Sequence, residues 1–196
     1  TQVSWLTYEG LNYLTSGELP KRRGNEHPNI VPYKTMPATD GYFILAVGND
    51  SQFAKFCAEA GRPDLAQDPR FTTNAERVRH RAALYPILDE LTATRPLNDW
   101  VDALNAHGVP SGPVNTLDRV FADPQIQHRD MQIQMDYPEA AKGKVDLIGN
   151  PIGFSRTPVS YRQPPPKMGE HTDALLREAL GLDDAEIKRL RDRGVI

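Results

Sequence analysis

Hydrophobic positions along the chain fall into two spacings, one helical and one alternating. Val3, Leu6 and Leu14 recur at helical spacing with Gly10 on the same face, so residues 1–15 are predicted to form a helix. The same spacing predicts further helices, with Asn74 and Thr172 as the expected N-caps of two of them. These helices cover residues 52–60, 74–91, 98–106, 116–122, 173–180 and a last stretch from Asp183, which forms a capping-box pair with Glu186, to Gly194.

Alternating apolar and polar residues predict two strand pairs. Residues 33–36 and 42–47 flank Asp40-Gly41, a dipeptide typical of hairpin turns. Residues 132–135 and 144–147 alternate in the same way about a turn at 138–143. The strands and helices do not alternate regularly, so the predicted fold class is α/β of a mixed α+β kind, with short sheets and peripheral helices.

Composition places the chain among ordinary globular proteins. It has 196 residues, of which 39% are hydrophobic and 25% charged, and its formal net charge is −3. The basic clusters at 21–23 and 77–81 are short, and we expect both to be solvated surface. No concentrated basic face is present, so a nucleic-acid partner is not expected.

The single cysteine, Cys57, excludes an internal disulfide framework and suits a reducing compartment, so we expect a cytoplasmic protein. Cys57 lies in an apolar helical stretch, where a buried, inert thiol is expected. No apolar run approaches the roughly 20 residues that span a bilayer, so no membrane partner is expected.

The residues alone do not show an active site. The five histidines (His27, His80, His107, His128 and His171) have no metal-ligand spacing, so no metal site is expected. The chain has no Walker loop, nucleophile elbow or Rossmann glycine fingerprint, and the prolines at 108–113 indicate a rigid turn. Two segments have both a functional and a purely structural interpretation. The polar loop at 23–33 is either a functional loop or a plain linker, and residues 169–172 are either a functional segment or the entry to a helix.

Many short motifs, in a fixed order, resemble those of class III CoA-transferases, the family of formyl-CoA transferase and carnitine CoA-transferase. They include Asn74 and Arg77 and, in one-letter code, GLNYL at 10–14, GNEHPNIVPY at 24–33, DGY at 40–42, VGND at 47–50, DPRF at 68–71, GVPSGPV at 108–114, FADPQ at 121–125, PPP at 164–166, GEHT at 169–172 and GVI at 194–196. The resemblance covers essentially the whole chain.

The resemblance implies an enzyme that transfers CoA from an acyl-CoA to a small carboxylic acid through an aspartyl-CoA thioester. The nucleophilic aspartate of the family lies in an N-terminal large domain, before the equivalent of Thr1. We therefore expect this chain to be a C-terminal portion that has no catalytic residue and is inactive alone. No tightly bound cofactor is expected, because coenzyme A is a substrate.

The resemblance also implies an organisation into parts. Residues 1–29 correspond to the end of a large-domain helix and a linker, 30–130 to a small α+β domain, and 131–196 to strands, a linker and helices that return to the large domain. Family dimers resemble two interlocked rings, so an intertwined homodimer is expected, with the linkers around 15–32 and 151–168 threading it.

One functional element is carried over from the family. A glycine-rich loop closes over the acyl group in formyl-CoA transferase, and the equivalent residues here are Gly24, Asn25, His27, Pro28 and Asn29. Pro28 replaces the glycine run and is expected to stiffen the loop. The side chains of His27 and Asn29 are expected to meet an acceptor carboxylate.

Two alternatives stay open at this point. An α-methylacyl-CoA racemase has the same fold and uses a general acid/base pair. A non-catalytic accessory or interaction domain is the other alternative, and its apolar faces would need a partner.

Overall fold

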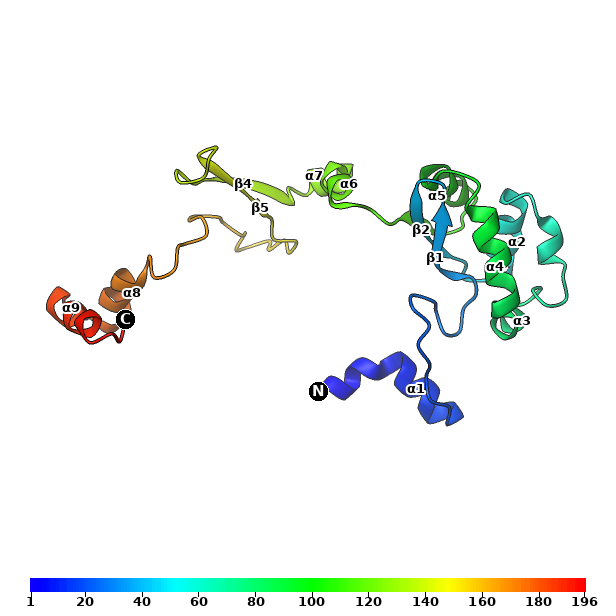
Figure 1. The fold of residues 1–196 in the computed structure, drawn as a ribbon, viewed down its shortest axis with the longest axis horizontal. Coiled ribbons are helices and arrows are strands. Elements are labelled where there is room, and N and C mark those ends of the chain that lie inside the picture. The colour runs from blue at the N-terminus through cyan, green and yellow to red at the C-terminus, as the bar shows by residue number, and fades with distance from the viewer. The chain divides into compact units, whose positions relative to one another are not determined.

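The computed structural model describes all 196 residues, which form two compact units, residues 1–114 and residues 115–196 (Figure 1). Both units combine helices with short antiparallel sheets, which confirms the mixed α/β fold class. The part boundaries expected at 29/30 and 130/131 refer to a longer protein and stay predictions.

Unit 1 begins with a 3-10 turn and a helix, and then alternates between a three-stranded sheet and the helices that cover it. Its elements are the 3-10 turn Gln2–Leu6, α1 (Thr7–Ser16), β1 (Tyr33–Ala38), β2 (Gly41–Ala46), α2 (Asp50–Glu59), the 3-10 turn Pro63–Ala66, α3 (Asn74–Arg79), α4 (Arg81–Thr92), α5 (Leu97–Ala106) and β3 (Ser111–Pro113).

The sheet of unit 1 is antiparallel, in the order β1-β2-β3. The β1–β2 hairpin pairs Ala38 with Gly41, which confirms the predicted turn. The turn residue Asp40 also accepts a hydrogen bond from the backbone N–H of Leu97 at 2.8 Å, so it satisfies one of the free N–H groups at the start of α5. One turn therefore fixes both the hairpin and the entry of a helix.

The core of unit 1 lies between this sheet and α2, α4 and α5. Trp100 is at its centre, with ring centroids 6.2 Å from Phe43 and 6.3 Å from Phe56, and its indole N–H donates to the carbonyl of Thr92. Cys57 is fully buried in this core, as predicted, and burial raises the pKa of its thiol to about 12. The thiol is therefore protonated and unreactive at neutral pH.

The helix predicted over 74–91 is wrong in two respects. It is interrupted at His80, so that α3 and α4 are separate helices, and the interruption lies well before Pro86, which stays inside α4. Asn74 is not the N-cap, because Thr73 precedes it and accepts from the N–H of Glu76. The Asn74 side chain instead forms hydrogen bonds with the backbone of residues 29 and 31.

Strand β3 was not predicted. Its residues, Ser-Gly-Pro, have no strand pattern, and the expected feature there was a rigid turn. The strand exists because Asn105 on α5 holds Ser111 through two hydrogen bonds, one in each direction, and so places the segment beside β2.

Unit 2 contains α6 (Leu117–Ala122), α7 (Pro124–His128), β4 (Gln132–Asp136), β5 (Lys144–Ile148), α8 (Thr172–Leu180) and α9 (Asp184–Asp192). Strands β4 and β5 form the predicted hairpin. Helix α7 was not predicted; the Asp123 carboxylate accepts from the N–H groups of Gln125 and Ile126 and caps its start. Residues 149–171 have no helix or strand.

The two C-terminal helices differ in how well their starts were predicted. The capping box of Asp183 and Glu186 is present in both directions, as predicted. The expected N-cap role of Thr172 is wrong, because Thr172 is the first helical residue and its predecessor, His171, makes no side-chain cap. The N–H of Thr172 instead donates to the carbonyl of Gly169 in a tight turn.

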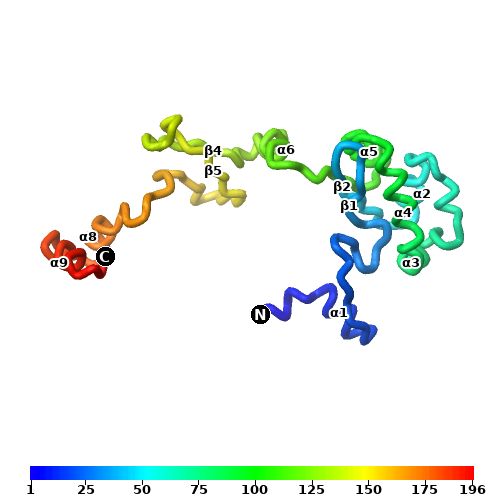
Figure 2. Tube along the Cα trace, viewed as in Figure 1, coloured from blue at the N-terminus to red at the C-terminus, as the bar shows by residue number.

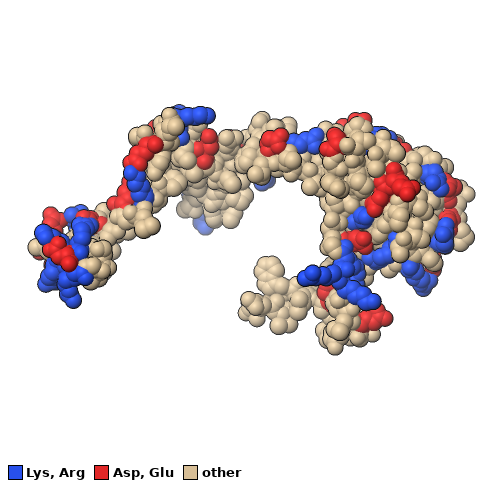
Figure 3. Space-filling view, viewed as in Figure 1, with Lys and Arg blue, Asp and Glu red and all other residues tan.

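Large apolar side chains are exposed on the N-terminal 3-10 turn, on α1 and through much of unit 2. Trp5 is 85% exposed, Leu14 78% and Ile148 73%, and Figure 3 shows few charges over α1. None of the helices combines the length and the apolar character that a membrane crossing requires.

Candidate functional site

The polar loop of residues 23–33 joins the segment after α1 to strand β1 (Figure 2). Its two ends are held side by side. The side-chain oxygen of Asn25 accepts from the N–H of Thr35 at 3.0 Å, and the N–H of His27 donates to the carbonyl of Tyr33 at 3.0 Å. Gly24 has a φ of +63°, a conformation that favours glycine, and lets the chain turn into the loop.

The imidazole of His27 lies between two tyrosines. It stacks on Tyr33 with a centroid distance of 5.2 Å and meets the edge of Tyr8 from α1 at the same distance. The N–H of Asn29 donates to Nδ1 of His27 at 3.1 Å. In the neutral ring this leaves the proton on Nε2, which is then a hydrogen-bond donor.

The His27 pKa makes the stability of unit 1 pH-dependent. Burial, followed by the charge of Arg81, lowers this pKa, and the charge of Glu9 opposes them. A lowered folded-state pKa gives stability that is fully present above the unfolded value of 6.5 and is lost as the pH falls through the folded value. We expect chemical denaturation to show that the wild type loses stability relative to His27→Asn between about pH 7.5 and about pH 5. A constant difference over that range would contradict this expectation.

The backbone of the polar loop is held by side chains from α3 and the start of α4. Arg81 donates to the carbonyls of His27 and Pro28, Asn74 donates to the carbonyl of Asn29, and Arg77 donates to the carbonyl of Val31. Asn74 also accepts from the N–H of Val31 at 3.0 Å. Four carbonyls in five residues therefore have side-chain partners on one neighbouring segment.

The expectation that the basic cluster at 77–81 is solvated surface is wrong. The side chain of Arg77 is fully buried; its guanidinium lies over the ring of Phe53 and also donates to the carbonyl of Phe71 and to Asp50. The Arg81 side chain is only 21% exposed, while Arg79, which pairs with Glu76, is 68% exposed. Asn74, Arg77 and Arg81 therefore form a loop-binding face, and Arg79 is the solvated arginine of the cluster.

A polar cavity of about 370 Å³ lies beside the loop, between α1 and the segment that follows it. Asn29 reaches it from the loop and donates from its amide to the side-chain oxygen of Asn12 at 3.1 Å. Arg23 also lines it and pairs with Glu9 at 3.2 Å. Asn12 and Arg23 were not predicted as site residues, although both lie within or next to quoted motifs.

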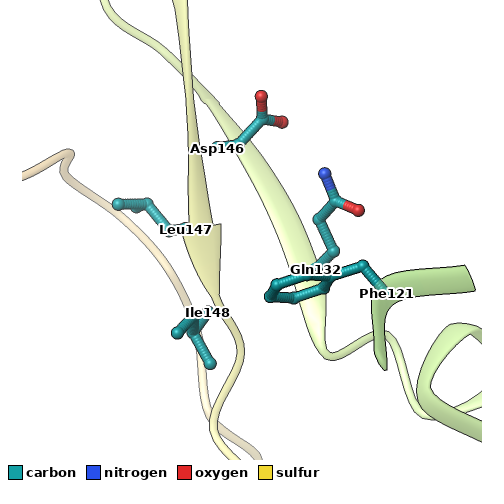
Figure 4. A pocket seen from close by; sticks show the side chains of 5 residues that line it. All are labelled: Phe121, Gln132, Asp146, Leu147 and Ile148. Atoms are coloured by element: carbon teal, nitrogen blue, oxygen red, sulfur yellow. The ribbon is translucent and has the colours of Figure 1, made fainter. Parts of the chain in front are cut away.

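Unit 2 has a cavity of a different kind, about 600 Å³ in volume (Figure 4). Gln132 and Ile148 are cross-strand partners on β4 and β5, and Phe121 approaches them from α6. The lining is otherwise Asp146 and Leu147, so it offers no basic side chain to a carboxylate or phosphate. The polar loop of unit 1 is therefore the better candidate site.

The other segment singled out from the sequence, residues 169–172, is a helix entry. The N–H of Lys167 donates to the Glu170 carboxylate at 2.7 Å, and Glu170 and Thr172 complete two successive backbone turns. No three His, Cys, Asp or Glu side chains lie close enough together to hold a metal ion. His80 contacts Glu76, and His107 contacts Glu59.

The geometry brings the five predicted loop residues into one segment, and it gives two of them polar groups for a ligand. His27 offers Nε2–H, and Asn29 is exposed with a side-chain amide. Donors of this kind bind carboxylates. Within the loop no activated nucleophile is present.

Comparisons with known proteins agree with the resemblance noted above. A succinate–glutarate CoA-transferase from Agrobacterium fabrum is 41% identical over 178 residues, which are 90% of this chain and 44% of that protein. The human succinyl-CoA:glutarate CoA-transferase is 35% identical over all 196 residues and 44% of its own length. The crystal structure of a CAIB/BAIF family protein from Brucella suis superposes with a TM-score of 0.73 at 44% identity, covering 89% of this chain and 44% of that one.

The chain thus spans less than half the length of these relatives. The model of CoA-transferase family III matches residues 1–172, which include α1, the polar loop and the whole core of unit 1. With this match over most of its length, the chain belongs to CoA-transferase family III.

Proposed function

We propose that this chain is the C-terminal portion of an enzyme that transfers CoA from an acyl-CoA to a carboxylic acid. The observation that carries the proposal is the family match over residues 1–172, together with relatives named as CoA-transferases at 35–41% identity. The donor and acceptor proposed first are succinyl-CoA and glutarate, because those acids name three of the relatives that match 90% or more of the chain.

The proposed chemistry is covalent and needs no cofactor. An aspartate carboxylate, supplied by a segment upstream of this chain, attacks the acyl-CoA carbonyl and expels the CoA thiolate, leaving a mixed anhydride. The thiolate then attacks the aspartyl carbonyl, which releases the donor acid and gives an aspartyl-CoA thioester. The acceptor carboxylate attacks this thioester, and the freed thiolate attacks the new anhydride, so that the product acyl-CoA leaves and the aspartate is restored.

The polar loop is proposed to receive the acceptor acid. His27 Nε2–H and the amide of Asn29 are the donors, and the lowered pKa of His27 keeps the ring neutral at physiological pH. A neutral donor stabilises a carboxylate without forming an ion pair that would hold the substrate or product too tightly. The side-chain contacts of Arg81, Asn74 and Arg77 with the loop backbone support a fixed placement of these donors.

The proposal extends to the partners of the chain. They are an N-terminal large domain that supplies the aspartate and most CoA contacts, and a second copy in an intertwined homodimer, in the cytoplasm. Exposed apolar side chains of the N-terminal 3-10 turn and α1, among them Val3, Leu6 and Leu14, support a covering partner of this kind.

The direct test uses the full-length protein that carries this chain. Incubation with succinyl-CoA and glutarate is expected to give glutaryl-CoA and succinate. Liquid chromatography and mass spectrometry detect both products. Hydroxylamine added during turnover is expected to convert an upstream aspartate into its hydroxamate. Exchange of an α-proton of a methylacyl-CoA with deuterated water, without CoA transfer, would instead identify a racemase, and the absence of both reactions would favour a non-catalytic domain.

A further inference from the structure

The contacts of the polar loop with α4 point to a function for one residue that the family resemblance does not include. We propose that Arg81 is a positioning residue for the acceptor acid: its guanidinium fixes the backbone at His27 and Pro28 and thereby sets where the side chains of His27 and Asn29 stand. This inference rests on the proposed CoA transfer for its catalytic consequence, while its structural part stands alone.

The guanidinium of Arg81 binds the loop through both of its terminal nitrogens. One terminal nitrogen of Arg81 donates to the carbonyl of His27 at 3.3 Å and the other donates to the carbonyl of Pro28. The Glu26 carboxylate lies 3.6 Å from the same side chain and balances its charge. Two consecutive carbonyls are held by one planar group, an arrangement that lysine, with a single ammonium, does not reproduce.

The two carbonyls that Arg81 holds belong to His27, which is one of the loop's two donor residues, and to Pro28, which lies between His27 and the other donor, Asn29. The peptide after Pro28 carries the N–H of Asn29, which donates to Nδ1 of His27 and so orients the imidazole. A shift of the backbone at Pro28 therefore moves both the ring of His27 and the side chain of Asn29. Small displacements of substrate-contacting groups are enough to weaken binding or reaction.

The other two residues of the loop-binding face have different structural roles. Arg77 is fully buried in the core of unit 1, so its removal affects the fold as a whole. Asn74 binds the far end of the loop, at Asn29 and Val31. Arg81 is at the edge of this face with a partly exposed side chain, so its replacement is expected to leave unit 1 folded.

Arg81 also acts on His27 through its charge. Its proximity is the second cause, after burial, of the lowered His27 pKa. Removal of the charge is expected to raise that pKa toward 6.5, whereas a lysine at the same position keeps the charge and loses only the paired contact with the two carbonyls. The two substitutions thus separate the electrostatic effect from the positioning effect.

The test compares Arg81→Met and Arg81→Lys with Arg79→Met, a matched change at a solvated arginine of the same cluster. Amide hydrogen exchange by NMR is expected to be faster at His27, Asn29 and Val31 in both Arg81 variants, with the amides of β2 unchanged. In the full-length enzyme the KM for the acceptor acid is expected to rise roughly three- to tenfold in both variants, with little change in the KM for the acyl-CoA. Titration of His27 is expected to move upward only in Arg81→Met.

The outcomes test separately whether Arg81 fixes the loop and whether the fixed loop positions the acceptor acid. Loop exchange in Arg81→Met equal to that in Arg79→Met overturns the proposal whatever the activity. Faster exchange with an unchanged KM for the acid also overturns it, because the loop then moves without affecting the substrate. If the wild-type full-length protein transfers no CoA at all, the proposed function and the acid-positioning role fall together, and the exchange data still decide whether Arg81 fixes the loop.

Discussion

Replacing Arg77 by methionine is expected to destabilise unit 1 by about 3–5 kcal/mol, the largest effect that we expect from any single change on the loop-binding face. The methionine fills much of the stem's volume and cannot donate. The carbonyls of Val31 and Phe71 then stay buried without their partner, and each such orphan costs about 1–3 kcal/mol. The stacking of the guanidinium on Phe53 is lost as well.

Urea denaturation of the chain, followed by tryptophan fluorescence, measures this loss, because Trp100 is at the centre of the same unit's core. Arg79→Met is the control: its side chain is solvated and pairs only with Glu76, so its effect is expected to stay within about 0.5 kcal/mol. An Arg77→Met protein as stable as this control would show that the buried guanidinium contributes nothing to folding and that water satisfies the two carbonyls.

The behaviour of Arg77 also shows what the sequence predicts well and what it does not. Elements whose determinants lie within a few residues were predicted correctly, such as the β1–β2 hairpin around Asp40-Gly41 and the capping box at Asp183 and Glu186. In both, the residues that decide the structure touch each other through adjacent backbone groups, so spacing alone specifies them.

Residues whose partners lie far along the chain were predicted less well. Asn74 has the composition of an N-cap, but its amide binds residues 29 and 31, more than forty positions earlier, and Thr73 caps the helix instead. Arg77 and Arg81 belong to a basic run, a pattern typical of solvated helices, and the loop carbonyls that bury them are visible only after folding. Strand β3 depends in the same way on Asn105 of α5.

The candidate site likewise contains residues that the sequence indicated and residues that it did not. The resemblance to class III CoA-transferases indicated the polar loop and its residues Gly24 to Asn29, because the motif is contiguous. The side chains that converge on the loop from elsewhere, Asn12 from α1 and Arg81 from α4, required the three-dimensional structure. The role of the loop toward an acid stays a prediction, and the imidazole of His27 offers the sharpest way to test it.

The two ring nitrogens of His27 have different roles that can be tested separately. Nδ1 accepts from the N–H of Asn29 and belongs to the loop, while Nε2–H is the proposed donor to the acceptor carboxylate. An asparagine at this position places an amide oxygen near the site of Nδ1 and has nothing at Nε2, whereas a glutamine places its amide nitrogen near Nε2 and has no acceptor at Nδ1. Both lose the aromatic ring between Tyr8 and Tyr33, so that loss is common to the pair.

We therefore expect His27→Asn to lower kcat/KM for the acceptor acid about ten- to hundredfold in the full-length enzyme, the value of one hydrogen bond to a charged group. His27→Gln is expected to recover most of this loss, because it restores the donor. Steady-state kinetics with the acid varied at saturating acyl-CoA measures both. The reverse order, with asparagine the more active variant, would mean that His27 acts by shaping the loop through Nδ1, and equal losses would mean that the stacked ring is what the site requires. Only the expected order assigns the contact with substrate to Nε2.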